Sequence, residues 1–260
     1  MVDRFLVSPY FIDKTLPELE QVAGPGWTAN RVEIAGPTAS ERVGVWLHPL
    51  ASWIAEVAAA GDRPVSVAGD CVSSLAVLAG LQRAGIPPTL LWLDAHGDFN
   101  TWETTPSGFL GGMPLAMLTG RGDRSLVSAL SLEPIDDKRV ILCDGRDLDP
   151  LDSQAVAGSG IAHMRHADAL LDLAVDGPLY VHLDTDWISP VDAPAMRYPA
   201  DGGPTATEAA RLLAQVARRN NVVAASLSAW APELDGDGAT RRSCMNVFVS
   251  LLQGRPTAQA

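Results

Sequence analysis

The segment LLWLDAHGDFNT at residues 90–101 places two carboxylates and an imidazole at alternate positions, Asp94, His96 and Asp98, directly after an apolar run. In an extended chain, side chains at alternate positions project to one face, so these three groups converge. Carboxylate and imidazole ligands suit Mn²⁺ or Fe²⁺, and a site that retains water is suited to hydrolysis. The segment therefore predicts a metal site at the end of a buried strand.

A second acidic pair, Asp184 and Asp186 in YVHLDTDWISP, follows another apolar run. A single Asp after a strand is more often a helix cap or a solvated loop residue. Four carboxylates and an imidazole gathered at strand ends would repel one another and would be costly to desolvate unless cations lay between them. The combination of both segments therefore favours the metal site.

Length and charge limit the classes of protein that are compatible with this chain. Its 260 residues, of which 47% are hydrophobic, are enough to bury one substantial core, and no linker divides them, so we expect a single domain over residues 1–260. The formal net charge of −12 argues against nucleic acid or an anionic membrane as a partner.

The three cysteines, Cys71, Cys143 and Cys244, form an odd set in a chain with no recognisable signal peptide or membrane-spanning segment. Reduced thiols in a cytoplasmic protein are therefore expected.

Apolar runs alternate with segments of helical periodicity along the chain. Strands are expected at 4–8, 31–34, 65–68, 89–94, 139–143, 179–184 and 222–227, and helices at 43–60, 72–84, 113–118, 149–157, 167–173, 205–218 and 241–252. This alternation predicts an α/β fold of three layers, α/β/α, with a mostly parallel central sheet. Ligands of such sheets bind outside the carboxyl ends of the strands, where Asp70, Asp94 and Asp184 fall.

Three dispersed segments resemble the signatures of the ureohydrolase (arginase/agmatinase) superfamily. They are VAGDCVSS at 67–74, LDAHGDFNT at 93–101 and HLDTDWISP at 182–190, supported by TTPSGFLGGMP at 104–114, GRDLDP at 145–150 and APELD at 231–235. The resemblance covers most of the chain. It implies an arginase-like fold and a homo-oligomer, either a trimer or a hexamer.

The resemblance also implies a hydrolase with two Mn²⁺ ions per chain, in which a hydroxide bridging the ions attacks the carbon of a guanidino or amidino small molecule. The products would be urea or a substituted urea and an amine. The implied metal ligands are Cys71, Asp94, His96, Asp98, Asp184 and Asp186. Among them Asp94 and Asp184 would bridge the ions. Asp98 and His96 would be the catalytic residues, with Asp98 moving the proton from water to the leaving amine.

Residues outside the metal motifs would bind the substrate. Asn100, Ser107 and Asp149 match positions that contact the distal polar groups of the substrate in arginases. Glu103 could supply a carboxylate for the guanidinium, although a solvated loop charge is the simpler interpretation. His182, two residues before Asp184, could donate a hydrogen bond to a ligating carboxylate without binding the metal itself, or could be an ordinary core histidine.

Three positions depart from the family pattern. Cys71 stands where most members have a histidine ligand, which shifts the preference of that site toward Fe²⁺ or Zn²⁺, or toward partial occupancy. Gly111 replaces the histidine that arginases use as a proton shuttle, and Ala229 replaces the glutamate that pairs with the guanidinium. A branch that includes Nω-hydroxyarginine hydrolase shares the cysteine, so an N-hydroxyguanidino substrate is one candidate.

Two classes of function stay open. The first is the guanidino or amidino hydrolase. The second is a metal-binding but catalytically weak arginase homologue that acts as a scaffold or sensor, which the three departures motivate. Amide deacetylation on the same fold is less favoured, because the segments DFNT and TTPSG follow the ureohydrolase pattern.

Overall fold

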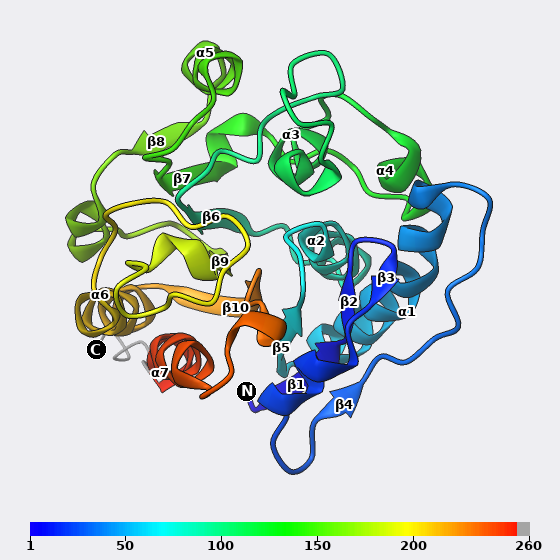
Figure 1. The fold of residues 1–260 in the computed structure, drawn as a ribbon, viewed down its shortest axis with the longest axis horizontal. Coiled ribbons are helices and arrows are strands. Elements are labelled where there is room, and N and C mark those ends of the chain that lie inside the picture. Colours follow the sequence, from blue (N-terminus) through cyan, green and yellow to red (C-terminus); the bar gives the residue numbers. More distant parts are fainter. Residues whose placement is uncertain (254–260) are drawn as a thin grey trace.

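The computed structural model describes residues 1–253 and is built around an eight-stranded sheet (Figure 1). Its strands are β1 (Asp3–Ser8), β4 (Thr28–Ala29), β5 (Arg63–Ala68), β6 (Thr89–Asp94), β7 (Val140–Asp144), β8 (Ala162–Met164), β9 (Pro178–Asp184) and β10 (Asn221–Ser228). The strand order is β4-β1-β5-β10-β9-β6-β7-β8, and each neighbouring pair is parallel. The predicted parallel sheet is confirmed, and the carboxyl ends of its strands therefore meet at one edge. A separate antiparallel hairpin joins β2 (Tyr10–Phe11) and β3 (Lys14–Thr15).

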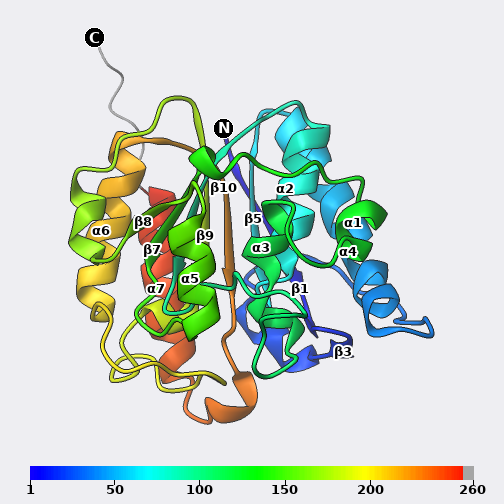
Figure 2. The same ribbon diagram turned by 90° about the horizontal axis from the view of Figure 1, so that it is seen from above.

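Helices cover both faces of this sheet, which gives the three predicted layers (Figure 2). One face carries α1 (Ala39–Ala59), α2 (Ser73–Arg83), α3 (Pro114–Leu118) and α4 (Ser125–Ala129), and the other carries α6 (Ala206–Arg219) and α7 (Ala239–Gln253). Helix α5 (Pro150–Gly158) lies at the end of the sheet near β8 (Figure 1). Short 3₁₀ turns occupy Pro17–Val22, Leu110–Gly112, Asp137–Arg139, Ala167–Leu171, Thr185–Trp187 and Pro232–Leu234.

Each face of the sheet contributes to a separate hydrophobic core. Leu90 and Trp92 of β6 pack with the α1 and α2 side, whereas Leu91 and Leu93 pack with the α6 and α7 side. This alternation explains why the central strands read as continuous apolar runs, since both of their faces are buried.

Helices α1 and α6 both start at capping boxes. In α1 the Thr38 side chain accepts from the backbone N–H of Glu41, and the Glu41 carboxylate accepts from Thr38 in return. The same exchange between Thr205 and Glu208 opens α6. Because these caps satisfy backbone N–H groups that a helix start leaves unpaired, α1 begins at Ala39 rather than at the predicted residue 43.

The predicted strand at 31–34 is wrong. Pairing with β1 occurs earlier, at Thr28 and Ala29, after which the chain leaves the sheet. The hydroxyl of Tyr10 accepts from the N–H of Val32 and donates to its carbonyl oxygen. A side chain therefore satisfies the backbone groups that a strand would have paired.

The predicted helix at 167–173 is only a 3₁₀ turn, Ala167–Leu171, and strand β8 and helix α4 were not predicted. All three are short, so their periodicity carries little information. Within residues 1–253, no helix combines the length and apolar character needed to cross a bilayer.

Candidate metal centre

The predicted ligands come from three neighbouring parts of the sheet edge. Asp94 ends β6, and His96 and Asp98 follow it in the next loop. Asp184 ends β9, and Asp186 lies in the 3₁₀ turn that follows. Cys71 lies between β5 and α2. Strand order places β6 beside β9, so the two acidic segments meet although they are far apart in the sequence.

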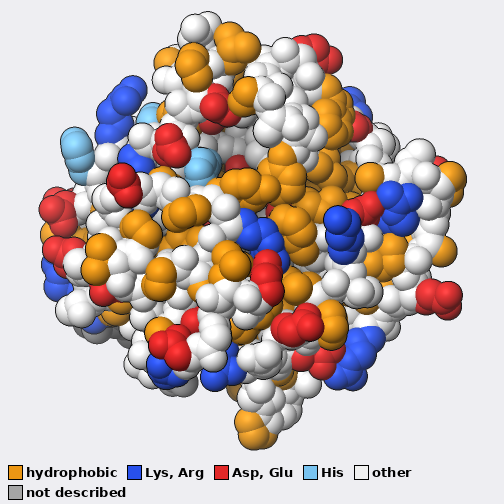
Figure 3. All heavy atoms as spheres, in the orientation of Figure 1, with side chains coloured by type: hydrophobic (Ala, Val, Ile, Leu, Met, Phe, Trp, Pro, Cys, Tyr) orange, Lys and Arg blue, Asp and Glu red, His pale blue; other side chains and the backbone are white. Residues whose placement is uncertain are grey.

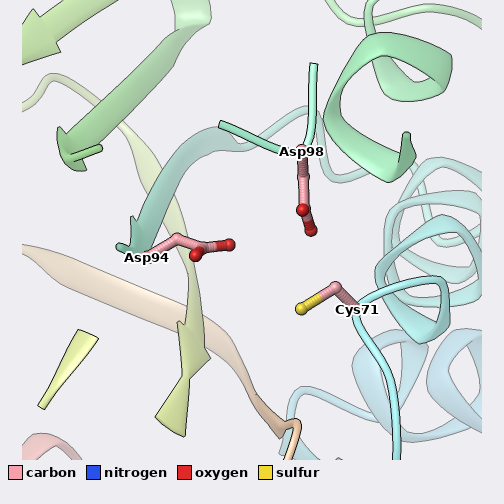
Figure 4. A group of neighbouring side chains, drawn as sticks. All are labelled: Cys71, Asp94 and Asp98. Atoms are coloured by element: carbon pink, nitrogen blue, oxygen red, sulfur yellow. The ribbon is translucent and has the colours of Figure 1, made fainter. Parts of the chain in front are cut away.

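The structure brings these side chains into two groups that share one residue. Donor atoms of Cys71, Asp94 and Asp98 lie within 4.8 Å of one another, and so do those of Asp94, His96 and Asp186. Figure 4 shows the three side chains of the first group pointing toward a common space. Because Asp94 belongs to both groups, the two groups could hold two adjacent cations with the Asp94 carboxylate between them.

Asp184 belongs to neither of these groups, although it is in direct contact with them. Its Oδ2 atom accepts a hydrogen bond from the Cys71 thiol, with an Sγ–O distance of 2.8 Å, and its Oδ1 atom accepts from the N–H of Asp186 at 2.9 Å. Asp184 lines the same pocket as Cys71, His96, Asp98 and Asp186. The Asp184 carboxylate therefore lies beside residues of both groups, as the predicted bridging role requires.

Burial makes this cluster unfavourable as an array of negative charges. Desolvation, reinforced by the charge of Asp186, raises the pKa of Asp94 to about 6. Desolvation and neighbouring carboxylates raise the pKa values of Asp98 and Asp184 well above their ordinary range. Burial opposes protonation of His96, but hydrogen bonds to Asp186 and Asp94 outweigh it and raise the His96 pKa to about 12. Divalent cations would relieve this repulsion, so the donor set fits a metal pair.

The raised pKa values predict how the stability of the metal-free protein depends on pH. Asp70 and Asp94, both with a folded-state pKa of about 6 against an ordinary 3.8, favour folding below pH 4 and lose that contribution as pH rises through 6. We expect the melting temperature with EDTA to fall between pH 5 and pH 8, and Mn²⁺ to raise it more at pH 8 than at pH 5. Equal Mn²⁺ stabilisation at both pH values would contradict this.

The side chains that support the predicted ligands are described by their hydrogen bonds. The indole Nε1 of Trp92 donates to Asp94 Oδ2 at 2.8 Å, so Trp92 supports the shared carboxylate. It lies two residues before Asp94 on the same strand face, which is the spacing that could have identified it. Buried His182 does not contact a carboxylate within the described residues. Its ring nitrogens face the hydroxyls of Ser226 at 2.7 Å and Ser228 at 3.3 Å, and Ser228 in turn lies 2.9 Å from Cys71 Sγ.

Five of the six predicted ligands line a pocket that opens at the surface (Figure 3). In that view a hollow lies between the segments labelled α3, α5 and β6 in Figure 1, with hydrophobic side chains along part of its rim. Asn100, Ser107 and Asp149, the residues predicted to bind the substrate, line the pocket, and Asn100 donates to the Asp149 carboxylate at 3.3 Å. Gly111 and Ala229 also line it.

Glu103 does not reach this pocket. Its side chain is exposed, and its carboxylate accepts from the hydroxyl of Thr101 two residues earlier at 2.6 Å. This local contact in the loop explains why the residue turns away, and the interpretation of Glu103 as a substitute for the missing glutamate is corrected.

Several pocket residues had no assigned role in the sequence. They are Phe11, Asp70, Phe109, Asp152, Arg197 and Tyr198. Asp152 accepts from the N–H of Phe99 at 3.0 Å, and burial raises its pKa to about 7. Its place three residues after Asp149 was a signal that could have been used. Phe11 and Arg197 lie in loops or short hairpins, where sequence periodicity gives no such signal.

Residues 26–253 match the model of the arginase family. A protein named arginase from Agrobacterium fabrum is 33% identical over 227 residues, which cover 81% of this chain and 70% of that protein. An arginase from Bacillus subtilis is 32% identical over 203 residues, covering 73% of this chain and 68% of its own length.

Solved structures share the fold. The crystal structure of arginase from Bacillus subtilis superposes with a TM-score of 0.82 at 24% identity, covering 97% of this chain and 99% of that one. A structure described as a hypothetical agmatinase from Burkholderia thailandensis superposes with a TM-score of 0.71 at 16% identity, covering 96% and 84% of the two chains.

Proposed function

Because this chain belongs to the arginase family, we propose that it hydrolyses a C–N bond of a guanidino or amidino small molecule and releases urea or a substituted urea with an amine. The observation that carries the proposal is the pair of donor groups that share Asp94 beneath the pocket. Relatives named arginase support the same reaction class.

The proposed metal ligands are the six residues expected from the sequence. They are Cys71, Asp94, His96, Asp98, Asp184 and Asp186. Two Mn²⁺ ions are the proposed cofactors, with Fe²⁺, Zn²⁺ or partial occupancy as alternatives because of Cys71. When bound, such ions lower the pKa of water and polarise the group under attack.

Protein side chains then position the reactants and move protons. Asp98 is buried and lines the pocket, so its carboxylate can accept a proton from water and donate it to the leaving amine. The Nδ1 atom of His96 lies 3.0 Å from Asp186 Oδ2, so this contact orients the imidazole within the group formed by Asp94, His96 and Asp186. Asn100, Ser107 and Asp149 offer polar contacts for the far end of the substrate.

A panel of substrates tests this function. Purified protein loaded with Mn²⁺ or Fe²⁺ would be incubated with arginine, hydroxyarginine, agmatine, 4-guanidinobutanoate and guanidine, and urea, hydroxyurea and ammonia would be measured. Release of urea or hydroxyurea from any of them supports the proposal. No bound metal after loading, as determined by elemental analysis, would overturn it.

Cys71 has a testable effect on metal choice. Its thiol is buried, and desolvation together with the charge of Asp184 raises its pKa well above the ordinary value, so it is a poor ligand for Mn²⁺. We expect Cys71→His to bind Mn²⁺ about 10-fold more tightly, as measured by metal retention during dialysis. Buried Cys244 lies outside both donor groups, so Cys244→Ala serves as the control. Unchanged retention in Cys71→His would assign Cys71 to packing alone.

Gly111 and Ala229 support the second candidate function, a metal-binding homologue with weak activity. Both line the pocket without a polar side chain. Tight metal binding without turnover of any compound in the panel would favour this scaffold or sensor over the hydrolase. The oligomeric state and the cytoplasmic location stay predictions.

A further inference from the structure

Arg197 is placed beside the pocket by a contact between two loops. Met196 and Trp230 form an isolated antiparallel bridge, and the N–H of Ala231 donates to the carbonyl of Ala195 at 3.1 Å. Arg197 and Ala229 directly adjoin the two bridged residues, and both line the pocket. Ala229 has no carboxylate that could pair with the Arg197 side chain.

The Arg197 guanidinium is fixed on one side and free on the other. Its Cζ atom lies 4.1 Å from the centre of the Phe11 ring, and Nη2 lies 2.6 Å from the Glu233 carboxylate. Its Nη1 atom is buried and has no hydrogen-bond partner among residues 1–253. A buried N–H without a partner is costly, which favours a ligand that accepts from it.

The surroundings make Arg197 distinctive in this pocket. Within the described part of the chain it is the only Lys or Arg that lines the pocket. The rings of Phe11 and Phe109 stack at 6.0 Å, and Phe109 packs against Tyr198 at 5.1 Å. This aromatic wall lowers the local dielectric constant and strengthens any ion pair formed beside it.

We propose that Arg197 determines specificity by binding a carboxylate of the substrate. The enzyme would therefore prefer a guanidino or amidino acid to a compound of the same length that has an uncharged amide or an ammonium group in place of the carboxylate. This inference rests on the proposed hydrolase function. The planar guanidinium suits a carboxylate, because its N–H groups match the two oxygen atoms.

Simple charge balance among the pocket residues is the competing explanation for Arg197. It predicts that Arg197 would be hydrogen-bonded to one of the pocket carboxylates. Burial raises the pKa of Asp70 and the charge of Arg197 acts to lower it, but the hydrogen bond that the structure gives the Asp70 carboxylate comes from the backbone of Val72. Arg197 instead pairs with half-exposed Glu233, which is not a pocket-lining residue among those described. Nη1 thus has no hydrogen-bond partner among residues 1–253.

Three compounds that share a four-carbon chain on the guanidino group test the proposal. They are 4-guanidinobutanoate, its primary amide, and agmatine. Binding to the metal-loaded protein would be measured by calorimetry, and turnover by urea release. We expect the wild type to bind the acid at least 10-fold more tightly than the amide, and more tightly still than agmatine. Arg197→Gln should lose most of this preference by weakening the acid about 10-fold, with little change for the amide. Exposed Arg211 on α6 provides the control, Arg211→Gln, which should keep the preference.

A second variant keeps Arg197 and removes its competing partner. Glu233→Gln should bind the acid as tightly as the wild type or more tightly, because Nη2 is no longer paired with a charge. This result would hold even if Arg197→Gln failed to fold. Weaker acid binding in Glu233→Gln, or equal binding of acid and amide by the wild type, would overturn the proposal.

The same data separate the two levels of inference. Charge-selective binding without urea release would reject the proposed hydrolase function and retain the anion site. Urea release with no dependence on the substrate carboxylate would retain the hydrolase and reject the role of Arg197. Binding of none of the three compounds would count against the anion site.

Discussion

Replacing Asp94 with Asn is expected to abolish turnover and tight metal binding while leaving the metal-free protein at least as stable as the wild type at pH 8. Asp94 is the residue that both donor groups share, so one substitution weakens both cation positions. A neutral amide is a poor ligand beside the remaining carboxylates, and we expect kcat/KM to fall by about 10³-fold or more.

The stability of metal-free Asp94→Asn separates this effect from misfolding. The Asp94 pKa of about 6 against an ordinary 3.8 corresponds to a cost of roughly 3 kcal/mol for the charged form at pH 8. The amide removes that cost and loses about 1 kcal/mol through a weaker contact with Trp92 or with the N–H of His96.

Denaturant unfolding with EDTA and metal titration by calorimetry measure the two parts of this prediction. Asp147→Asn is the control, because Asp147 also lines the pocket but its side chain is 67% exposed and its Oδ2 atom is 3.7 Å from His96. That variant should keep its metal and most of its activity. Tight binding of two ions by Asp94→Asn would contradict the shared-ligand assignment.

Gly97→Ala is expected to disrupt the loop that carries His96 and Asp98. A Cβ atom at this position would lie 2.1 Å from Asp152 Oδ2 and 2.7 Å from Leu148 Cδ2, so both side chains would have to move. Asp152 is a short, buried side chain that holds the N–H of Phe99, and moving it breaks that bond. We expect a loss of about 1–3 kcal/mol in the free energy of unfolding.

The same displacement would reach the metal ligands. Asp98 has a positive φ of 48°, an unfavourable conformation for a residue other than glycine, so it depends on its surroundings. Metal affinity should therefore fall at least ~10-fold. Gly44→Ala in α1 is the control, because nothing lies within 4 Å of its added Cβ atom and alanine favours a helix. Wild-type metal affinity in Gly97→Ala would show that the loop adapts without cost.

Local features of the amino-acid sequence determined the class of fold and the ligand types. Continuous apolar runs in β6 and β9 predicted strands buried on both faces, and their carboxyl ends carried the predicted acidic residues. These predictions succeeded because alternation within one strand and the meeting of parallel strand ends depend on short-range geometry. The segment 31–34, RVEI, also has two β-branched residues, but it has no strand partner, and Tyr10 satisfies the backbone of Val32.

The tertiary structure alone decided which side chains face one another. It placed Trp92 against Asp94 and His182 against Ser226, turned Glu103 toward Thr101, and brought Arg197 and Ala229 to one pocket beside a bridge between two loops. Spacing along a chain specifies the direction of a side chain relative to its own strand or helix. It does not specify the path of a loop or the order of strands, and these bring together groups that are distant in sequence.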